Sequence, residues 1–106
     1  MIKLYHVKGT RGIRVIWVME ELGIPYEVEI IDFSAEYRET HEWRSKNPVG
    51  KVPVMEDGKL TMFESGAMVQ YLLDKYGEGQ LQPAPGSDDH AQYLQWGWFA
   101  ESTFAR

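Results

Sequence analysis

The sequence predicts an α/β fold, a four-stranded mixed sheet with helices packed on its faces, followed by a helix of a second, all-α domain. Stretches rich in β-formers alternate with stretches of helical apolar spacing, in the order βαβ-α-ββα over residues 1–78. A linker rich in glycine and proline follows at 79–86. Residues 87–106 then carry one more helical pattern, which is apolar and aromatic.

Composition and charge limit the class of protein. The chain has 106 residues, 43% of them hydrophobic and 25% charged, which suits one small globular domain with a single core. The formal charge of -5 argues against a nucleic-acid partner, because phosphate binding needs a basic face. The longest apolar run, residues 15–19, is too short to span a membrane, and the N-terminus lacks a secretory signal pattern. We therefore expect a soluble, cytoplasmic protein.

Cysteine is absent, and the three histidines, His6, His41 and His90, are far apart in the sequence. No thiolate of this chain can act as a nucleophile or as a soft metal ligand. The histidines lack the close spacing of a zinc site, so we predict no metal. A thiol oxidoreductase is therefore disfavoured.

The first half of the sheet domain predicts a strand, a helix and a second strand. Residues 2–6 alternate between apolar and polar side chains, and Gly9 and Thr10 break this pattern. Apolar residues then recur at helical spacing, at Val15, Val18, Met19 and Leu22. Gly23 ends the helix, and residues 26–31 alternate as the second strand. Two strands joined by one crossover helix are expected to lie parallel.

The second half of the sheet domain predicts a hairpin and a helix. Residues 32–47 are polar and weakly patterned, so we expect a loop with one irregular helix. Strands at 52–55 and 60–63 flank an Asp-Gly pair at 57–58, which is a strong turn signal. Helical spacing returns over residues 65–76, and a glycine follows.

The last predicted helix begins with Ser87 or Asp88 as its cap. Its aromatic side chains point to most sides, and they are Tyr93, Trp96, Trp98, Phe99 and Phe104. A helix that is apolar all round is normally buried on more than one face. We interpret residues 87–106 as the first helix of a truncated helical domain, and we expect the chain alone to self-associate.

Pro53 stands at the start of a predicted strand. Proline lacks the donor that a sheet ladder needs, so it belongs at a strand start or at an edge. Two interpretations are open. A cis Val52–Pro53 peptide would turn the backbone of Val52 outward, where it could pair with an extended peptide. A trans proline would be a plain edge residue.

Glu64 and Ser65 open the helix over residues 65–76. Ser65 is either a simple N-cap or part of a carboxylate site, since a helix N-terminus offers free N–H groups and a positive dipole end. Glu64 beside it could hold an ammonium group. The pair would then suit the end of a ligand that carries both groups.

These stretches together resemble a known family. Residues 47–54, 57–58 and 63–67, in this order and at this spacing, are similar to the glutathione-site signature of glutathione S-transferases. Residues 14–26 resemble the first helix and second strand of the same family. The resemblance implies a thioredoxin-like fold with a cis-proline.

The resemblance also implies an organisation and a function. Residues 1–78 would be the N-terminal glutathione-binding domain, 79–86 the linker, and 87–106 the start of the helical C-terminal domain. Members of the family are dimeric detoxifying enzymes that use glutathione as co-substrate and attack an electrophilic, hydrophobic substrate with its thiolate. We expect a homodimer, and only weak activity or none from this chain alone. A noncatalytic glutathione-transferase-like binding or assembly module is the alternative.

The glutathione-binding residues that the resemblance implies are Lys51, Val52, Pro53, Glu64 and Ser65. Val52 would pair with the cysteinyl backbone beside cis-Pro53, and Glu64 with Ser65 would hold the γ-glutamyl end. Lys51, or a residue of 32–47, would contact the glycine carboxylate.

A hydroxyl near the start of the first helix activates the thiol in this family. Thr10 is the first candidate for this catalytic role and Tyr5 the second. Relatives often have serine or cysteine in this loop, and Gly12 stands where a second serine is common. Thr10 could instead be a plain helix N-cap, and Tyr5 a core residue. Arg11 could add positive charge near the thiolate.

Overall fold

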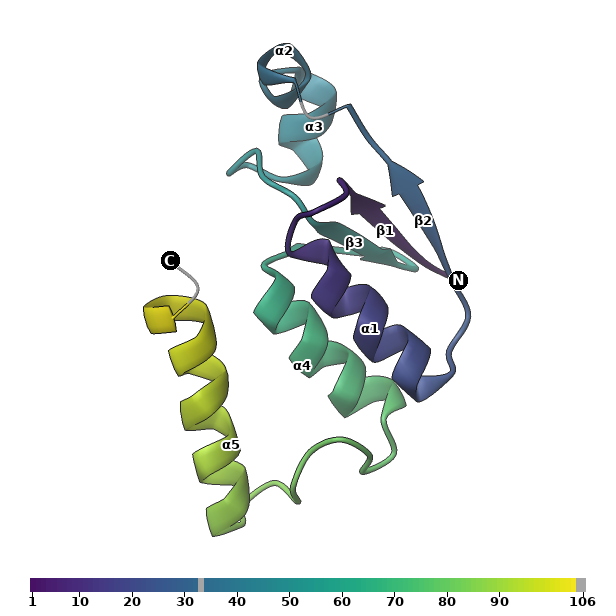
Figure 1. Cartoon of the computed structure of the whole chain (residues 1–106). Coiled ribbons are helices and arrows are strands. Elements are labelled where there is room, and N and C mark those ends of the chain that lie inside the picture. Colours follow the sequence, from purple (N-terminus) through teal and green to yellow (C-terminus); the bar gives the residue numbers. More distant parts are fainter. Residues whose placement is uncertain (33, 105–106) are drawn as a thin grey trace.

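The computed structural model describes residues 1–32 and 34–104, and its centre is a mixed sheet with the strand order β2-β1-β3-β4 (Figure 1). The strands are β1 (Ile2–His6), β2 (Tyr26–Ile30), β3 (Val54–Asp57) and β4 (Leu60–Phe63). β2 is parallel to β1, whereas β3 is antiparallel to both β1 and β4. The predicted α/β fold with a four-stranded mixed sheet is confirmed.

Helices cover both faces of this sheet. They are α1 (Gly12–Leu22), α2 (Ala35–Arg38), α3 (His41–Lys46), α4 (Ser65–Tyr76) and α5 (Asp88–Phe99), which continues as the π-helical turn η1 (Ala100–Phe104). α1 and α4 lie side by side on one face, and α3 packs on the other (Figure 1). None of the helices within residues 1–32 and 34–104 has both the length and the apolar character that a membrane span requires.

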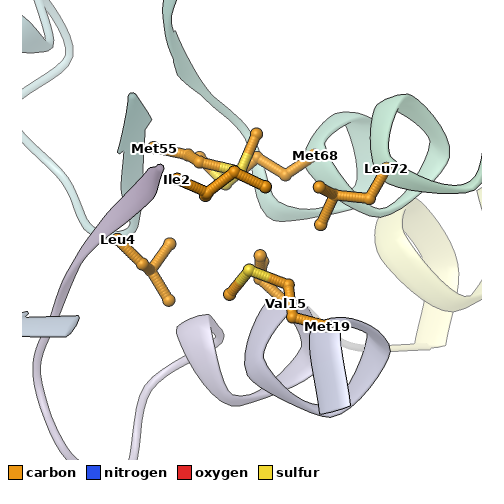
Figure 2. Close-up of a cluster of buried hydrophobic side chains, with 7 residues drawn as sticks. All are labelled: Ile2, Leu4, Val15, Met19, Met55, Met68 and Leu72. Atoms are coloured by element: carbon orange, nitrogen blue, oxygen red, sulfur yellow. The ribbon is translucent and has the colours of Figure 1, made fainter. Parts of the chain in front are cut away.

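The main core lies between the sheet and the α1–α4 pair. Figure 2 shows its side chains, which are Ile2, Leu4, Val15, Met19, Met55, Met68 and Leu72. Residues two apart on β1 point to the same face, and residues four apart on α1 lie one helical turn apart, so the predicted periodicities converge here. Burying one such side chain contributes about 1.5–3 kcal/mol. This layer therefore holds both helices against the sheet.

A smaller core lies on the opposite face of the sheet. It consists of Tyr5, Trp43 and Val54, with Trp43 fully buried. The rings of Tyr5 and Trp43 meet edge to face at 6.0 Å between centroids, a favourable aromatic geometry. α3 is held to the sheet by this contact.

The segment between β2 and β3 differs from the prediction of one irregular helix. Two short helices occur, and each has its own hydroxyl cap: Ser34 accepts a hydrogen bond from the backbone of Tyr37, and Thr40 accepts one from Trp43. Each cap satisfies an N–H that a helix start leaves unpaired, so the segment folds as two turns rather than one. Part of the predicted loop, residue 33, lies outside the described residues.

The hairpin also differs in detail from the prediction. β3 begins at Val54 rather than at residue 52, because Pro53 has no N–H to give to the ladder. Asp57 is still paired with Leu60, so the turn contains only two residues instead of four. Gly58 opens this turn with a φ of 61°, a left-handed conformation that glycine adopts without strain.

α5 is capped by Ser87, which accepts a hydrogen bond from the backbone of His90. Polar contacts attach this helix to the rest of the chain: the Tyr93 hydroxyl donates to Gln70 of α4 at 2.9 Å. Most of its aromatic side chains are exposed, and in Figure 1 the helix stands beside α4 rather than over the sheet. The predicted helix extends to residue 106, but residues 105–106 lie outside the described part of the chain.

Candidate functional site

The sheet register brings three chain segments together at one end of the strands, and this end, which includes Val52, is named the Val52 edge. β1 runs antiparallel to β3, and Tyr5 pairs with Val54 near the carboxyl end of β1. Val54 also pairs with Phe63 at the carboxyl end of β4. The loop after β1, the residues before β3 and the residues after β4 therefore meet at this edge. α1 and α4 both begin here, so two positive helix ends face the same place.

The Val52–Pro53 peptide is cis, as one of the two sequence interpretations predicts, and the trans alternative is wrong. Val52 is partly exposed and takes part in no ladder pair of the described strands. Its N–H and C=O are thus unused by the sheet, and backbone polar groups need partners. This position is suited to pairing with an extended peptide ligand.

The loop before Val52 is fixed from inside by Asn47. The Asn47 amide donates to the carbonyl of Lys51 at 2.7 Å, and its oxygen accepts from the N–H of Val49 at 2.9 Å. Asn47 is only 1% exposed, so these hydrogen bonds are shielded from water. In the sequence, Asn47 stands out only as part of the family signature, because the spacing along the chain does not show that its side chain is buried.

Glu64 and Ser65 lie where β4 passes into α4. Glu64 occupies the N-cap position with a φ of 80°, which costs a non-glycine residue about 1–3 kcal/mol. Its side chain makes no capping hydrogen bond, so the N–H groups of the first turn stay available. Ser65 is buried at 3% exposure and is the first helical residue, not the N-cap that the simpler interpretation predicted.

A charged cluster that the sequence analysis missed flanks the start of α4. Glu101 of η1 forms an ion pair with Arg14 and a second with Arg11 at 3.5 Å. A Cβ at Gly66 would lie 3.1 Å from Cγ of Glu101, so this carboxylate sits against the first turn of α4. No local spacing could signal the cluster, because its members come from opposite ends of the chain.

Thr10 lies in the turn between β1 and α1. Its hydroxyl donates to the carbonyl of Val7 at 2.6 Å, and Arg11 rather than Thr10 occupies the N-cap position of α1. The plain N-cap alternative is therefore wrong for Thr10. Donation to a ligand sulfur would require the hydroxyl to turn away from Val7.

His6 explains why a glycine stands at position 12. Gly12 is buried, and a Cβ there would overlap the imidazole ring of His6. Burial lowers the pKa of His6, so the neutral ring is favoured. A serine at position 12 would not fit beside this ring.

Tyr5, the second catalytic candidate, has its hydroxyl engaged on the opposite face of the sheet from α1. It donates to Glu56 at 3.0 Å, and its ring packs in the smaller core with Trp43. Lys46 also pairs with Glu56, at 3.3 Å. These contacts favour the alternative of Tyr5 as a core residue.

Lys51 lies at a small cavity next to the Val52 edge. This cavity has a volume of about 180 Å³ and is also lined by Arg38, Glu39 and Arg44. A larger cavity of about 590 Å³ lies between the far end of α4 and the linker, around Leu73 and away from the sheet edge. The geometry of the edge, not cavity size, therefore defines the candidate site. No group of three or more His, Asp or Glu side chains in the described ranges is arranged to hold a metal ion.

The fold and the edge define a thioredoxin-like domain of the glutathione transferase type. The chain belongs to the family described as "Glutathione S-transferase, N-terminal domain", whose profile matches residues 1–74. It is 34% identical over 97% of its length to glutathione S-transferase 3 of Schizosaccharomyces pombe. It is 37% identical over 88% of its length to a dichloromethane dehalogenase of Methylorubrum extorquens.

Solved structures agree with this assignment. A glutathione transferase of Phanerochaete chrysosporium, solved in complex with oxidized glutathione, has a TM-score of 0.85 and 37% identity over 95% of this chain. The chain spans 42% and 34% of the length of the two sequence relatives, and 48% of that solved chain. The membership in the superfamily that the sequence predicts is confirmed.

Proposed function

We propose that the protein is a glutathione transferase that binds glutathione along the Val52 edge and activates its thiol for conjugation to an electrophilic, hydrophobic substrate. The observation that carries the proposal is the backbone of Val52 before cis-Pro53, which pairs with no described strand, next to the N-terminus of α4, whose N-cap side chain makes no capping hydrogen bond. An extended tripeptide with a carboxylate at each end matches this arrangement. The related Phanerochaete protein with bound oxidized glutathione supports it.

Each part of the ligand has a partner in this proposal. Val52 pairs with the cysteinyl backbone, and Ser65 with the first-turn N–H groups of α4 holds the γ-glutamyl carboxylate. Glu64 accepts from the γ-glutamyl ammonium group. Lys51 attracts the glycine carboxylate across the cavity of about 180 Å³.

Thr10 is the proposed thiol-activating residue. When its hydroxyl donates to the sulfur, the thiolate is stabilised relative to the thiol and the thiol pKa falls. Tyr5 is the second candidate, although its hydroxyl donates to Glu56 here. The proposal extends to a domain boundary at residue 78, a linker over 79–86, a helical domain from residue 87, a cytoplasmic location and a homodimer.

Titration calorimetry with glutathione tests the binding site. Replacement of Ser65 by alanine removes a charge-assisted hydrogen bond, and we expect a loss of about 1.5–3 kcal/mol in binding free energy. Ser45→Ala is the matched control, because the Ser45 side chain is exposed and its hydroxyl donates to Glu42. If the wild-type chain is folded but does not bind glutathione at millimolar concentration, the proposal is contradicted.

The ultraviolet absorbance of the thiolate tests the activation step. We expect Thr10→Val to raise the pKa of the bound thiol toward its free value, and Thr10→Ser to keep it low. Tyr5→Phe should leave it unchanged. A wild-type bound thiol with the ordinary pKa would favour the noncatalytic binding module, a second candidate suggested by the engagement of the Thr10 hydroxyl with Val7.

A further inference from the structure

The guanidinium group of Arg44 joins three separate chain segments. Arg44 lies on α3, and its Nε donates to the carbonyl of Arg38 at the end of α2 at 3.1 Å. Nη1 donates to the carbonyl of Pro48 in the loop before Val52 at 2.7 Å. Nη2 pairs with the Glu39 carboxylate at 2.8 Å. The guanidinium is a rigid planar fork of five N–H donors that can reach three separate acceptors in fixed directions, whereas a lysine ammonium is a compact point charge that does not reproduce this geometry.

Gly50 forms the surface on which this guanidinium rests. Gly50 is buried with a φ of 75°, and a Cβ there would lie 2.7 Å from Cζ of Arg44. Both the backbone conformation and the space therefore require glycine. The close approach shows that Arg44 is packed against the loop rather than extended into water.

Arg44 holds the carboxyl end of α2, the end that lines the cavity. The helix has four residues, and none of them is buried. Arg44 binds the carbonyl of Arg38 and the carboxylate of Glu39, directly at its carboxyl end. Tyr37 also holds the helix, because its ring packs against Trp43 at 5.8 Å between centroids, but this contact lies on the side of the sheet and does not fix the carboxyl end beside the cavity.

The Val52 edge, in contrast, has anchors besides Arg44. Asn47 holds the carbonyl of Lys51 from the buried side, and Val54 continues into the sheet. Loss of Arg44 should therefore release the carboxyl end of α2 while Val52 stays in place. The cavity beside Lys51 would widen on the side of Arg38 and Glu39.

We propose that Arg44 is a positioning residue that shapes the subsite for the glycine end of the tripeptide by holding α2 against the Val52 loop. The proposal rests on the proposed function, namely glutathione binding at this edge. Arg44 itself does not need to touch the ligand. It sets the distance between the α2 side of the cavity and Lys51.

Calorimetry with two ligands on the 106-residue chain tests the proposal: glutathione, and γ-glutamylcysteine, which lacks the glycine. We expect Arg44→Met to weaken glutathione binding about tenfold and dipeptide binding less than twofold. Lys59→Met is the control, because it removes the same charge from the exposed hairpin turn. Amide hydrogen exchange of α2 should accelerate in Arg44→Met and not in the control.

Two further variants separate positioning from direct attraction of the ligand by the Arg44 charge. Arg44→Lys keeps the charge but loses the fork, so we expect an intermediate loss of glutathione affinity. Glu39→Gln removes one anchor of the guanidinium, and we expect about threefold weaker glutathione binding. If the charge of Arg44 attracted the ligand directly, Glu39→Gln would instead tighten glutathione binding, because Arg44 would lose a carboxylate that competes with the ligand. Glu39 is exposed, so this variant keeps the fold even where Arg44→Met does not.

The outcomes are distinct. Equal losses for both ligands, a wild-type-like Arg44→Lys, or tighter glutathione binding by Glu39→Gln would each overturn the positioning role while leaving the binding site intact. If the wild-type chain binds neither ligand, the proposed function fails, and the role of Arg44 fails with it. A glutathione-specific loss in all three variants supports the role.

Discussion

His6 and Gly12 show how a single residue can be set by space at the start of a helix. The imidazole fills the volume that a side chain at position 12 would need. We therefore expect Gly12→Ala to destabilise the fold by about 1–3 kcal/mol, the usual cost of overpacking a core. Urea unfolding followed by circular dichroism measures this difference.

The matched control for that variant is Gly97→Ala. Gly97 lies inside α5, and a Cβ there would meet nothing within 4 Å. Alanine in an open helical position should stabilise by about 0.5–1 kcal/mol. Equal effects at positions 12 and 97 would show that His6 does not restrict the α1 start.

At the residue scale the sequence identified the Val52 edge better than the chemistry beside it. Val52 and Pro53 could be found because a proline at a strand start carries a strong local constraint. The hydrogen bond of Thr10 to Val7 and the contact of Arg44 with Gly50 could not be predicted from the sequence. They depend on side-chain directions and on loop geometry, which spacing along the chain does not encode.

At the scale of elements, Asp57 attaches the β3–β4 hairpin to the end of α4. Its carboxylate accepts from Tyr76 at 2.6 Å, from Tyr71 at 2.7 Å and from Lys75 at 3.2 Å. The hydrogen bonds from Tyr76 and Tyr71, with that from Lys75, lower the pKa of Asp57 despite its burial. The hairpin turn and the helix therefore form one mechanical unit.

We expect Asp57→Asn to cost about 1.5–3 kcal/mol at pH 7, because it weakens hydrogen bonds to a charged acceptor. A carboxyl group with a depressed pKa in the folded state stabilises above its unfolded pKa, near 3.9, and this stabilisation is lost as pH falls through the lower folded pKa. The gap between the variant and the wild type should thus be constant near neutrality and shrink below about pH 4. Urea unfolding at several pH values measures it.

Asp74→Asn provides the control for this pH dependence. Asp74 is exposed, and within residues 1–32 and 34–104 its carboxylate accepts from the amides of Gln70 and Gln82. Its replacement should change stability by less than 1 kcal/mol. A gap for Asp57→Asn that persists undiminished to pH 2 would contradict the proposed role of the ionised carboxylate.

Element order was predictable from the sequence, and element boundaries were less so. Apolar periodicity placed α1, α4 and the strands, because each buries one face or stripe in the core. The segment from residue 34 to residue 46 escaped this logic. Its two short helices bury little except Trp43, so apolar spacing does not reveal them. Each helix starts at a hydroxyl cap, and the sequence offers several hydroxyl residues without showing which of them cap a helix.

For the whole molecule, exposed aromatic side chains on α5 and η1 form the surface through which we expect copies of the chain to associate. Trp96, Trp98 and Phe104 are 59%, 72% and 78% exposed. Aromatic side chains bury large areas on contact, so we expect the chain to associate at micromolar to millimolar concentration and to do so less after Trp98→Gln with Phe104→Gln. Analytical ultracentrifugation measures the change.

Trp17→Gln is the control for this effect. Trp17 is 67% exposed, but it belongs to α1, and its indole N–H donates to Glu21 of the same helix. We expect the control to associate like the wild type. A monodisperse wild-type monomer would show that the α5 surface does not drive contact between copies.

The attachment of α5 to the sheet domain is polar, so it should respond to salt. Glu101 joins it to Arg14 and Arg11, and Tyr93 joins it to α4. Exposed and half-exposed ion pairs contribute about 0.2–1 kcal/mol and are screened over about 3 Å at 1 M salt. We expect Glu101→Gln, or 1 M salt, to speed proteolysis within residues 78–86. Ser102→Ala should leave the rate of proteolysis unchanged. An unchanged rate in Glu101→Gln would show that the Glu101 ion pairs do not hold α5 against the sheet domain.

The central place of β1 has a consequence for synthesis on the ribosome. β1 is translated before the strands that flank it, which are β2 on one side and β3 on the other. Lys3 of β1, for example, pairs with Glu56 of β3, which is translated much later. Until the hairpin emerges, the nascent chain has a β1–β2–α1 unit whose inner strand is still an open edge. Such edges are sites of intermolecular pairing. Ribosome-stalled chains that end before β3 should therefore be more protease-sensitive and more dependent on chaperones than chains that include the hairpin and α4.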